Sequence, residues 1–291
     1  MTLKSINYFS ETCTKPGFPL WCVKNYDPGM ISRFSKPHFC NGLSFVSILC
    51  FYLITYLYIQ RLFFIMESPM VTLVTPTTYS RVKFGKLMVS NILTQTYPHD
   101  KLTWLVVGDD LPETKVAFES IFKHLQGIKC RYVPCDIKGD IGGKRNFAVS
   151  QATTKIIANL DDDDLYMKSY VEYSIKELKR TKSGIVGCRD MLIFFPECDG
   201  KMVYLKGISI HEATMVCTKS HWKTNKYHDG VMKGEGTKMV NGRYNNELNI
   251  REVMICLAHG ENTYDKSRFL KSPQVEISES VKKNLINMIN G

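Results

Sequence analysis

The chain has no pair of cysteines at a Cys-x-x-Cys spacing, although its 291 residues include 10 cysteines. Cysteine pairs at that spacing are the usual signature of a structural zinc site, so no such site is expected. The sequence also contains no Asn-x-Ser/Thr motif for N-glycosylation. Its absence favours a main region that stays outside the secretory lumen.

No stretch dense in lysine and arginine carries interleaved aromatic residues, so nucleic acid is not expected as a partner. The formal net charge is nevertheless +10. A positive protein of this kind suits an anionic partner such as a nucleotide, a phosphate-bearing substrate or an acidic membrane surface, without selecting among them.

Charged residues are missing from residues 43–59, where Leu, Ile, Phe, Tyr and Val dominate. The longer apolar stretch over residues 43–66 is just long enough to span a bilayer, and it predicts an N-terminal transmembrane helix. An alternative stays open, because Met66 and Met70 precede the globular region and translation could begin there. A single-pass membrane protein is expected if the anchor is translated, and a cytoplasmic protein otherwise.

From Met70 onward, apolar runs of strand length alternate with segments of helical spacing. This β-α-β alternation predicts the α/β class, with a mainly parallel, Rossmann-like sheet flanked by helices. Strands are predicted at 71–75, 104–107, 129–133 and 155–160, and helices around 84–92 and 113–125 and after Gly143. The predicted organisation is a poorly ordered segment (1–42), the possible anchor (43–66), the main domain (70–270) and a C-terminal tail (271–291).

Four consecutive aspartates, Asp161 to Asp164, follow the predicted strand 155–160. Four adjacent like charges cost stability unless a cation or strong hydrogen bonds offset their repulsion. Ligands of open α/β sheets bind at the carboxyl ends of the strands, so this acidic run predicts a divalent-metal site. A solvated acidic loop or helix start is the alternative, because aspartate also favours helix N-termini.

Two further turns are expected at the same edge of the sheet. Asp109 and Asp110 follow the strand 104–107, and a glycine-rich turn at a helix start carries Lys144 and Arg145. Backbone amides of a helix N-terminus, together with two cations, can neutralise a diphosphate. Such glycine turns and Lys-Arg pairs also occur on ordinary surfaces, so the prediction gains its weight from the acidic run that follows.

The order of these motifs resembles that of family 2 glycosyltransferases with the GT-A fold. The likeness rests on residues 71–77, 91–98 (Asn-Ile-Leu-Thr-Gln-Thr-Tyr-Pro), 104–110, 143–152 (Gly-Lys-Arg-Asn, then Ala152) and 159–164, which look like the first strand, a helix end, a strand ending in an Asp pair, a basic segment and an extended DxD motif. It covers roughly residues 70 to 265. The resemblance implies metal-dependent transfer of a sugar from a nucleotide-diphosphate sugar to the hydroxyl of a glycan, protein or lipid acceptor.

The resemblance also assigns roles to individual residues. Mn²⁺ or Mg²⁺ would be held by Asp161, Asp163, Asp164 and His259, the last being equally consistent with a structural histidine. The donor would contact Pro76, Thr77, Tyr79, Asp109, Asp110, Lys144, Arg145, Asn146, Asp161 and Asp162. Within the acidic run, Asp162 is expected to be the residue whose replacement costs least.

The second half departs further from the family pattern. Members usually carry a Glu-Asp pair that supplies the catalytic base, whereas here Glu235 is followed by Gly236. Glu235 is still the predicted base, because the chemistry needs only one carboxylate near the acceptor. An exposed loop glutamate is the alternative. His211, Glu212 and Trp222 lie where the acceptor pocket is expected, and Trp222 is predicted to be a core aromatic.

The processive members' QxxRW motif is absent, so a polysaccharide synthase is disfavoured. The resemblance then implies an inverting, non-processive hexosyltransferase. Two other functions stay open. A sugar-phosphate nucleotidyltransferase is disfavoured, because residues 75–81 lack the glycine-rich signature that such enzymes carry after the first strand. A non-catalytic nucleotide-sugar or glycan-binding protein stays open because of the altered Glu235-Gly236 pair.

Overall fold

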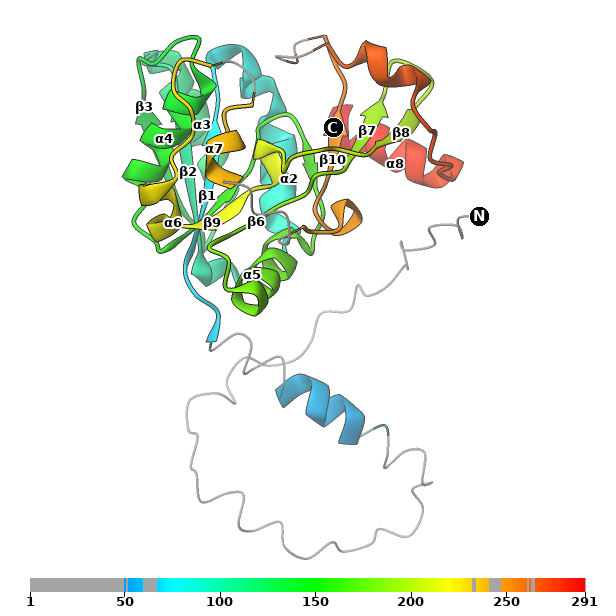
Figure 1. Cartoon of the computed structure of the whole chain (residues 1–291), viewed down its shortest axis with the longest axis horizontal. Coiled ribbons are helices and arrows are strands. Elements are labelled where there is room, and N and C mark those ends of the chain that lie inside the picture. Colours follow the sequence, from blue (N-terminus) through cyan, green and yellow to red (C-terminus); the bar gives the residue numbers. More distant parts are fainter. Residues whose placement is uncertain are drawn as a thin grey trace, which may run out of the picture. The chain divides into compact units, whose positions relative to one another are not determined.

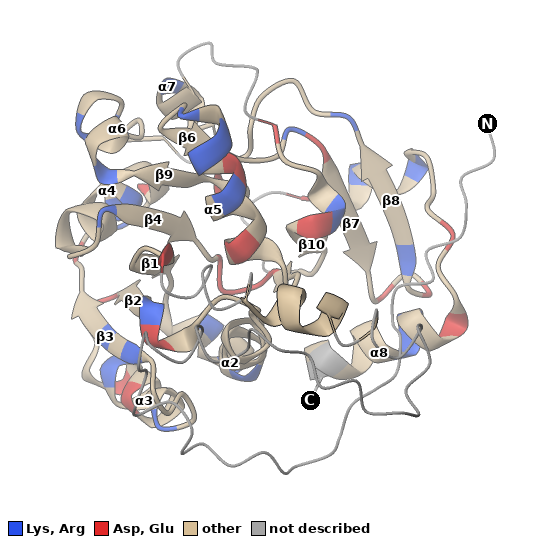
Figure 2. Ribbon diagram, turned by 90° about the horizontal axis from the view of Figure 1, so that it is seen from below, with Lys and Arg blue, Asp and Glu red and all other residues tan. Residues whose placement is uncertain are grey.

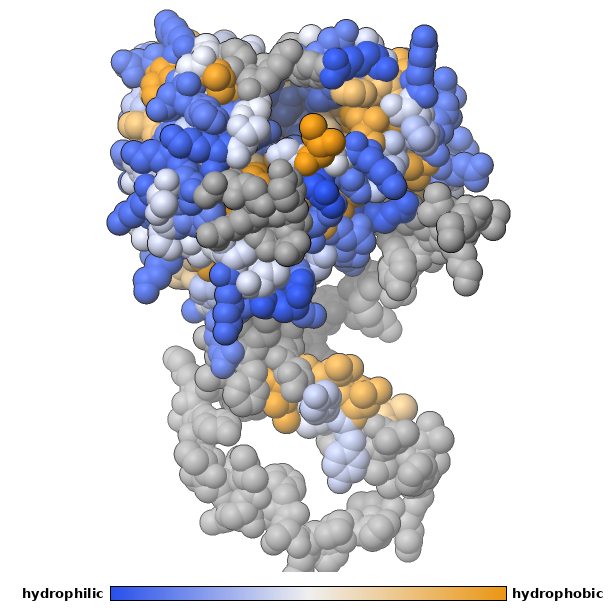
Figure 3. Space-filling model, in the orientation of Figure 1, coloured by the Kyte–Doolittle hydropathy of each residue, from blue (hydrophilic) through white to orange (hydrophobic). Residues whose placement is uncertain are grey.

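The computed structural model describes residue 50 and residues 52–59, 67–231, 234–240, 247–260, 262 and 265–290. The chain divides into two compact units, Met1–Met66 and Glu67–Gly291. In the first unit, residues 52–59 are helical and expose apolar side chains such as Leu53 and Ile54 (Figure 3). No helix within the described part of the chain is long and apolar enough to cross a membrane. Most of the anchor predicted over 43–66 lies outside the described residues, so it stays a prediction.

The second unit is built on a six-stranded sheet of order β3-β2-β1-β4-β9-β6. Its strands are β1 (Val71–Pro76), β2 (Leu102–Gly108), β3 (Lys129–Pro134), β4 (Ile156–Asn159), β6 (Ile185–Val186) and β9 (Val216–Thr218). The first four strands of the chain pair in parallel, as predicted, whereas β9 runs antiparallel to both of its neighbours. The sheet is therefore mixed, and its antiparallel side was not predicted.

Helices cover both faces of this sheet (Figures 1 and 2). They are α2 (Gly85–Leu93), α3 (Pro112–Phe122), α4 (Ile141–Gln151), α5 (Tyr170–Thr181), α6 (Lys219–Thr224) and α7 (Thr237–Val240). On one face, α4 and α6 pack on Val74 and Leu105. On the other, Trp104 meets Phe118 and Phe122 of α3 in edge-to-face contacts. The alternation of Trp104 and Leu105 between two apolar layers is the pattern of a strand buried on both faces.

A second, four-stranded sheet stands beside the first, in the order β5-β10-β7-β8. Its strands are β5 (Leu165–Tyr166), β7 (Met191–Phe195), β8 (Lys201–Leu205) and β10 (Met254–Leu257), and the helix α8 (Glu279–Asn290) lies on this side of the unit (Figure 1). Short 3-10 helices complete the second unit: η2 (Tyr79–Phe84), η3 (His99–Lys101), η4 (Glu212–Thr214), η5 (Ile250–Glu252) and η6 (Ser267–Lys271). Because β5 begins directly after Asp164, the acidic run lies at the junction of the two sheets.

The carboxyl ends of β1, β2 and β4 meet at one edge of the main sheet. Pro76 pairs with Val107, and Val74 pairs with Asn159. Since β9 runs antiparallel to β4, the beginning of β9 lies beside the end of β4. This register brings four connections together, namely η2 with its preceding loop, the turn after β2, the acidic run and η4.

Candidate active site

Arg145 connects the acidic run to the predicted base. Its Nη1 and Nη2 donate to Asp161 Oδ1 and Oδ2 at 2.9 and 2.8 Å, a two-pronged geometry typical of strong Arg–carboxylate pairs. Its Nε donates to Glu235 Oε1 at 3.2 Å. Arg145 is 3% exposed and Glu235 is 5% exposed, so the two form a buried ion network with Asp161. The exposed loop glutamate considered for Glu235 is therefore wrong.

Arg81 of η2 provides the cation for the middle of the acidic run. Its Nη1 lies 2.8 Å from Asp162 Oδ1 and 2.7 Å from Asp163 Oδ2. Asp162 also accepts a hydrogen bond of 2.6 Å from Thr77 Oγ1, and it is 2% exposed. These contacts argue against Asp162 being the cheapest residue to replace, because the loop after β1 folds back onto its carboxylate and buries it.

Burial and the neighbouring Asp163 carboxylate raise the pKa of Asp162 to about 7, against the opposing charge of Arg81. Burial also works to raise the pKa of Asp163, but the hydrogen bond to His259 and the charge of Arg81 outweigh it and lower that pKa. The two adjacent aspartates are thus driven in opposite directions, as expected for neighbouring carboxylates that share one cation.

Asp164 points toward the second sheet. Its Oδ1 accepts a hydrogen bond of 3.0 Å from Leu257 N of β10, and its carboxylate interacts with the charge of Lys266. Burial raises the pKa of Asp164 to about 6, with the Lys266 ammonium opposing that rise. This placement suits support of the acidic run across the two sheets, while the predicted metal-ligand role of Asp164 stays a prediction.

The surroundings of Asp163 are where a metal ion would fit. Asp163 Oδ2 lies 3.0 Å from His259 Nε2 and accepts from Asn262 Nδ2 at 3.2 Å. Among the described residues, no three His, Cys, Asp or Glu side chains gather closely enough to hold a metal by themselves. A carboxylate and an imidazole still suit an ion that takes its other ligands from a phosphate-bearing substrate and water. Asp161, also predicted as a ligand, is held by Arg145 instead.

The predicted donor residues near the ends of β1 and β2 do come together. Tyr79 N donates to Asp109 Oδ2 at 2.8 Å, and Lys144 Nζ donates to the carbonyl oxygen of Thr77 at 3.0 Å. Pro76 is buried as the last residue of β1, and Asp110 is exposed. Lys144 therefore fastens α4 to the loop after β1, and Asp109 fixes the first turn of η2.

Gly108 explains the close packing of the turn after β2. A Cβ at this position would lie 2.3 Å from the Tyr132 hydroxyl oxygen. That hydroxyl donates to the carbonyl oxygen of Asp109 at 2.6 Å. Gly108 therefore leaves room for the Tyr132 side chain at the end of β2.

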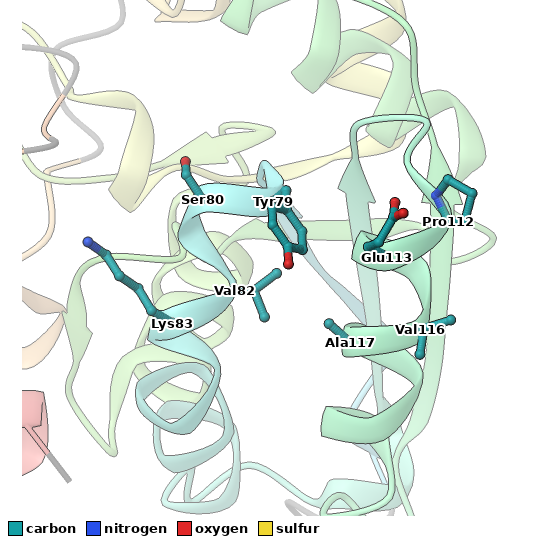
Figure 4. Close-up of a pocket in the computed structure, with 8 residues that line it drawn as sticks. All are labelled: Tyr79, Ser80, Val82, Lys83, Pro112, Glu113, Val116 and Ala117. Atoms are coloured by element: carbon teal, nitrogen blue, oxygen red, sulfur yellow. The ribbon is translucent and has the colours of Figure 1, made fainter.

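A surface pocket of about 620 Å³ lies between η2 and α3 (Figure 4). Figure 4 shows Tyr79 and Val82 pointing toward α3, and Lys83 pointing away from it. The Tyr79 side chain is 52% exposed. The pocket is lined by Tyr79, Ser80, Val82, Lys83, Pro112, Glu113, Val116 and Ala117. The pocket lies on the side of η2 that faces α3, and η2 is also the element that carries Arg81.

Asn146 was predicted to contact the donor, but its side chain is fully engaged by the protein. Its Oδ1 accepts from Trp222 Nε1 and Tyr227 N, and its Nδ2 donates to the Tyr227 carbonyl oxygen and to Asp229 Oδ1. These bonds tie α4 to α6 and the loop after it. Trp222 is 7% exposed and belongs to the core, as predicted.

Glu212 is a carboxylate whose role the sequence did not reveal. Gly236 N donates to Glu212 Oε1 at 2.8 Å, and the charge of Glu235 acts on Glu212. Glu212 and Glu235 therefore lie together at Gly236. The sequence placed Glu212 in the expected acceptor region without giving it a chemical role, and Arg81 was not singled out at all. The only signal for Arg81 was a charged residue in a connection expected at the same sheet edge as the acidic run.

Residues 77–195 match the sequence model of glycosyl transferase family 2. The structure resembles the mannosyltransferase PcManGT from Pyrobaculum calidifontis in complex with GDP-Man and Mn²⁺, with a TM-score of 0.52, 17% identity, and coverage of 72% of this chain and 66% of that one. It resembles S. aureus TarS 1–349 in complex with UDP-GlcNAc with a TM-score of 0.51 and 14% identity, over 76% and 71% of the two chains. These likenesses establish the α/β fold. No curated protein matches the chain.

Proposed function

We propose that this chain, whose residues 77–195 match the model of glycosyl transferase family 2, transfers a sugar from a nucleotide-diphosphate sugar to an acceptor hydroxyl. The observation that carries the proposal is the convergence of the acidic run with the loop after β1 and the turn after β2. All three lie within the matched residues. GDP-Man and UDP-GlcNAc in two proteins of the same fold support a donor of this class.

The donor's base would lie near the turn after β2. Tyr79 offers a half-exposed aromatic ring there, and aromatic side chains stack well on planar bases. Asp109 accepts a hydrogen bond from the backbone amide of Tyr79 and so holds that residue in place. The next residue, Asp110, is exposed, and its carboxylate could contact the donor. The diphosphate would then reach the acidic run, where Arg81 and Lys266 supply positive charge.

Asp163 and His259 would hold a divalent ion, Mn²⁺ or Mg²⁺, together with the donor diphosphate. The ion supplies a Lewis acid for the charge that develops on the departing diphosphate. The chain's own residues prepare this place: Arg81 and His259 keep Asp163 ionised, and Asn262 orients its Oδ2. The Mn²⁺ in a protein of the same fold supports this part of the proposal.

Transfer to the acceptor would proceed by in-line displacement with inversion at the anomeric carbon. A carboxylate beside the acceptor would take the hydroxyl proton. Glu212 and Glu235, which lie together at Gly236, are the two candidates. The product would be released after each addition, in line with the missing QxxRW motif. The acceptor would be a glycan, a protein or a lipid.

Attachment to a membrane through residues 43–66 belongs to the same proposal. The apolar side chains exposed along residues 52–59 support it. Fractionation of cells that express the full chain, or the chain without residues 43–66, tests it. The full chain is expected with the membranes, and an equal distribution of both proteins would contradict the anchor.

The activity is tested by incubating the full chain with UDP-Glc, UDP-GlcNAc, UDP-Gal and GDP-Man in the presence of Mn²⁺ and a panel of free sugars and glycosides. Released UDP or GDP is measured. Asp163→Asn is expected to lower turnover by about 100-fold or more, because it removes charge where the diphosphate departs. Asp199→Asn is the matched control, since Asp199 lies on the surface and its positive φ of 55° suits asparagine.

Nucleotide release by the wild type, lost in Asp163→Asn and kept in Asp199→Asn, would support the proposal. Thermal stabilisation by a nucleotide sugar without any release would point to a binding protein instead. Neither release nor stabilisation with any donor would contradict the proposed function.

A further inference from the structure

We propose that Glu212, and not Glu235, accepts the proton of the acceptor hydroxyl, in the space that Gly236 leaves open. This inference rests on the proposed function, because it assigns a step of the same reaction. It was not available from sequence, where the two residues are separated by more than twenty positions and Glu212 stands outside the Glu-Gly pair.

The first support is the position of η4. Val216 of β9 pairs with Ala158 of β4 in antiparallel register, so the residues just before β9 lie beside those just after β4. A single hydroxyl group spans the two segments: Tyr166 Oη accepts from Asp161 N at 2.8 Å and donates to the Ala213 carbonyl oxygen at 2.9 Å. Glu212, the neighbour of Ala213, is therefore held at the acidic run.

The second support is the space above Gly236. A Cβ built on Gly236 would lie 2.5 Å from Met215 Cε, 2.7 Å from Glu212 Cγ and 2.9 Å from Glu212 Oε1. Real side chains do not approach so closely, so the Glu212 carboxyl and the Met215 methyl group together occupy the volume that a side chain at position 236 would enter. The family's Glu-Asp pair would place a carboxylate at this position. Here Glu212 brings one to the same place from another element, and Gly236 N binds its Oε1.

The third support is the different accessibility of the two glutamates. Glu235 is 5% exposed, and its Oε1 is bound to the buried Arg145. A proton on Glu235 would weaken that buried ion pair. Glu212 is partly exposed and is held mainly by a backbone amide, so it can meet an acceptor and take a proton without breaking the ion network.

Burial, and then the charge of Glu235, raise the pKa of Glu212. A raised pKa makes a carboxylate a better proton acceptor near neutral pH. In the step itself, the acceptor oxygen forms a bond to the anomeric carbon while the bond from that carbon to the diphosphate oxygen breaks. The hydroxyl proton passes to Glu212, and the electron pair of the broken bond leaves with the nucleoside diphosphate.

The decisive experiment compares Glu212→Gln with Glu235→Gln in the full chain, using whichever donor and acceptor of the panel the wild type turns over. Glu212→Gln keeps an oxygen for the Gly236 amide, so the fold is expected to persist and is checked by thermal unfolding. Its kcat is expected to fall by about 100-fold or more, while the KM for the donor changes by less than about threefold.

A relocated carboxylate gives a second, independent measurement. Glu212→Ala removes the Glu212 atoms beside Gly236, and the Met215 methyl group, 2.5 Å from a Cβ at this position, is the end of a flexible side chain that has to shift. Gly236 has no left-handed φ that would strain another residue. The double variant Glu212→Ala/Gly236→Asp is expected to recover at least about tenfold in kcat over Glu212→Ala alone, because a carboxylate returns to the same place. A purely structural role for Glu212 would not produce such a recovery.

The inference is overturned if Glu212→Gln keeps wild-type kcat, or if Glu212→Ala/Gly236→Asp folds but is no more active than Glu212→Ala. If Glu235→Gln loses kcat while Glu212→Gln keeps it, Glu235 is the proton acceptor. If the wild type turns over no donor at all, the proposed function itself fails. Activity that is lost in Asp163→Asn but kept in Glu212→Gln would leave the proposed function standing and remove only this inference.

Discussion

Arg81 and Asp163 form an ion pair, with Nη1 lying 2.7 Å from Oδ2. The same nitrogen reaches Asp162 Oδ1, so one guanidinium pairs with two adjacent aspartates that are 2% and 7% exposed. Ion pairs with arginine side chains of the protein itself therefore stabilise the acidic run. A divalent ion that binds Asp163 has to share that carboxylate with Arg81 or displace it.

Removing Arg81 is expected to destabilise the fold. Arg81→Ala leaves two buried carboxylates without their shared cation, and breaking a buried pair in this way costs about 3 kcal/mol. Added Mn²⁺ is expected to restore part of the lost stability in Arg81→Ala, because the ion can replace the missing positive charge. Urea unfolding of the wild type and the variant, with and without Mn²⁺, measures both effects.

Arg180→Ala is the matched control for that measurement. Arg180 pairs with Glu177 at the surface, and exposed pairs contribute less than about 1 kcal/mol. Equal losses in Arg81→Ala and Arg180→Ala would contradict the role given to Arg81. A large loss in Arg81→Ala that Mn²⁺ leaves unchanged would mean that no ion takes its place.

Asp162 is buried, and its replacement is expected to cost more stability than that of an aspartate that faces solvent. Asp162→Ala removes the acceptor for Thr77 Oγ1 and one partner of Arg81, and the loss of a buried, charge-assisted hydrogen bond costs about 2 kcal/mol. Asp110→Ala, at an exposed position of the neighbouring turn, is expected to change stability by less than about 0.5 kcal/mol. Chemical unfolding separates the two, and a cheaper Asp162→Ala would overturn this assignment.

The parallel half of the fold was predictable because its signals are local. β1, β2 and β4 are apolar runs, β3 alternates exposed and half-buried residues, and the helices α2 and α3 between these strands show apolar spacing. The second sheet was not predicted, although its strand β7 is an apolar run. β5 has two residues and β10 has four, and β5 pairs with β10, and β10 with β7, between distant parts of the chain. Sequence periodicity does not reach contacts of this kind.

The site was predictable to the extent that strand order alone determines it. The turn at Asp109 and the acidic run meet because the ends of parallel strands share an edge. The partners of each charge were not predictable, because they depend on how the connections fold back. Arg81 reaches Asp163 from a 3-10 helix after β1, and Glu212 reaches Gly236 because β9 turns antiparallel to β4.

Gly142 belongs to the glycine-rich turn before Lys144 and Arg145, which was expected to bind a diphosphate through its backbone amides. In the structure Gly142 packs closely against the backbone of another loop. A Cβ on Gly142 would lie 1.7 Å from the His228 carbonyl oxygen and 3.1 Å from Glu235 Cβ. Helix propensity alone would favour alanine by roughly 1 kcal/mol, but a clash with backbone outweighs it. Gly142→Ala is therefore expected to destabilise the fold by about 2 kcal/mol.

Thermal or chemical unfolding measures this loss, and Gly260→Ala provides the control. No atom of the described residues, apart from its chain neighbours, lies within 4 Å of a Cβ on Gly260, and its φ is an ordinary one. A change below about 0.5 kcal/mol is expected there. If Gly142→Ala proved as stable as the wild type, the close contact between α4 and the loop that carries Glu235 would not exist.

His211, the neighbour of Glu212, is expected to make stability depend on pH. Burial lowers the pKa of His211 to about 4, with a hydrogen bond to the backbone of Asp190 opposing that shift. Its Nε2 finds no hydrogen-bond partner among the described residues. Between pH 6.5 and 4 the unfolded chain binds a proton at this histidine that the folded chain does not bind. The stability contributed by neutral His211 is thus present above about pH 6.5 and lost as the pH falls toward 4.

Urea unfolding at pH 7 and pH 4.5 tests this dependence, with His211→Asn as the variant that cannot titrate. The wild type is expected to lose about 2 kcal/mol more than His211→Asn over this interval, while contributions from other titrating groups cancel in the comparison. His124→Asn, at an exposed position, is expected to lose as much as the wild type. Equal losses in the wild type and His211→Asn would mean that His211 takes up its proton in the folded state as readily as in the unfolded chain.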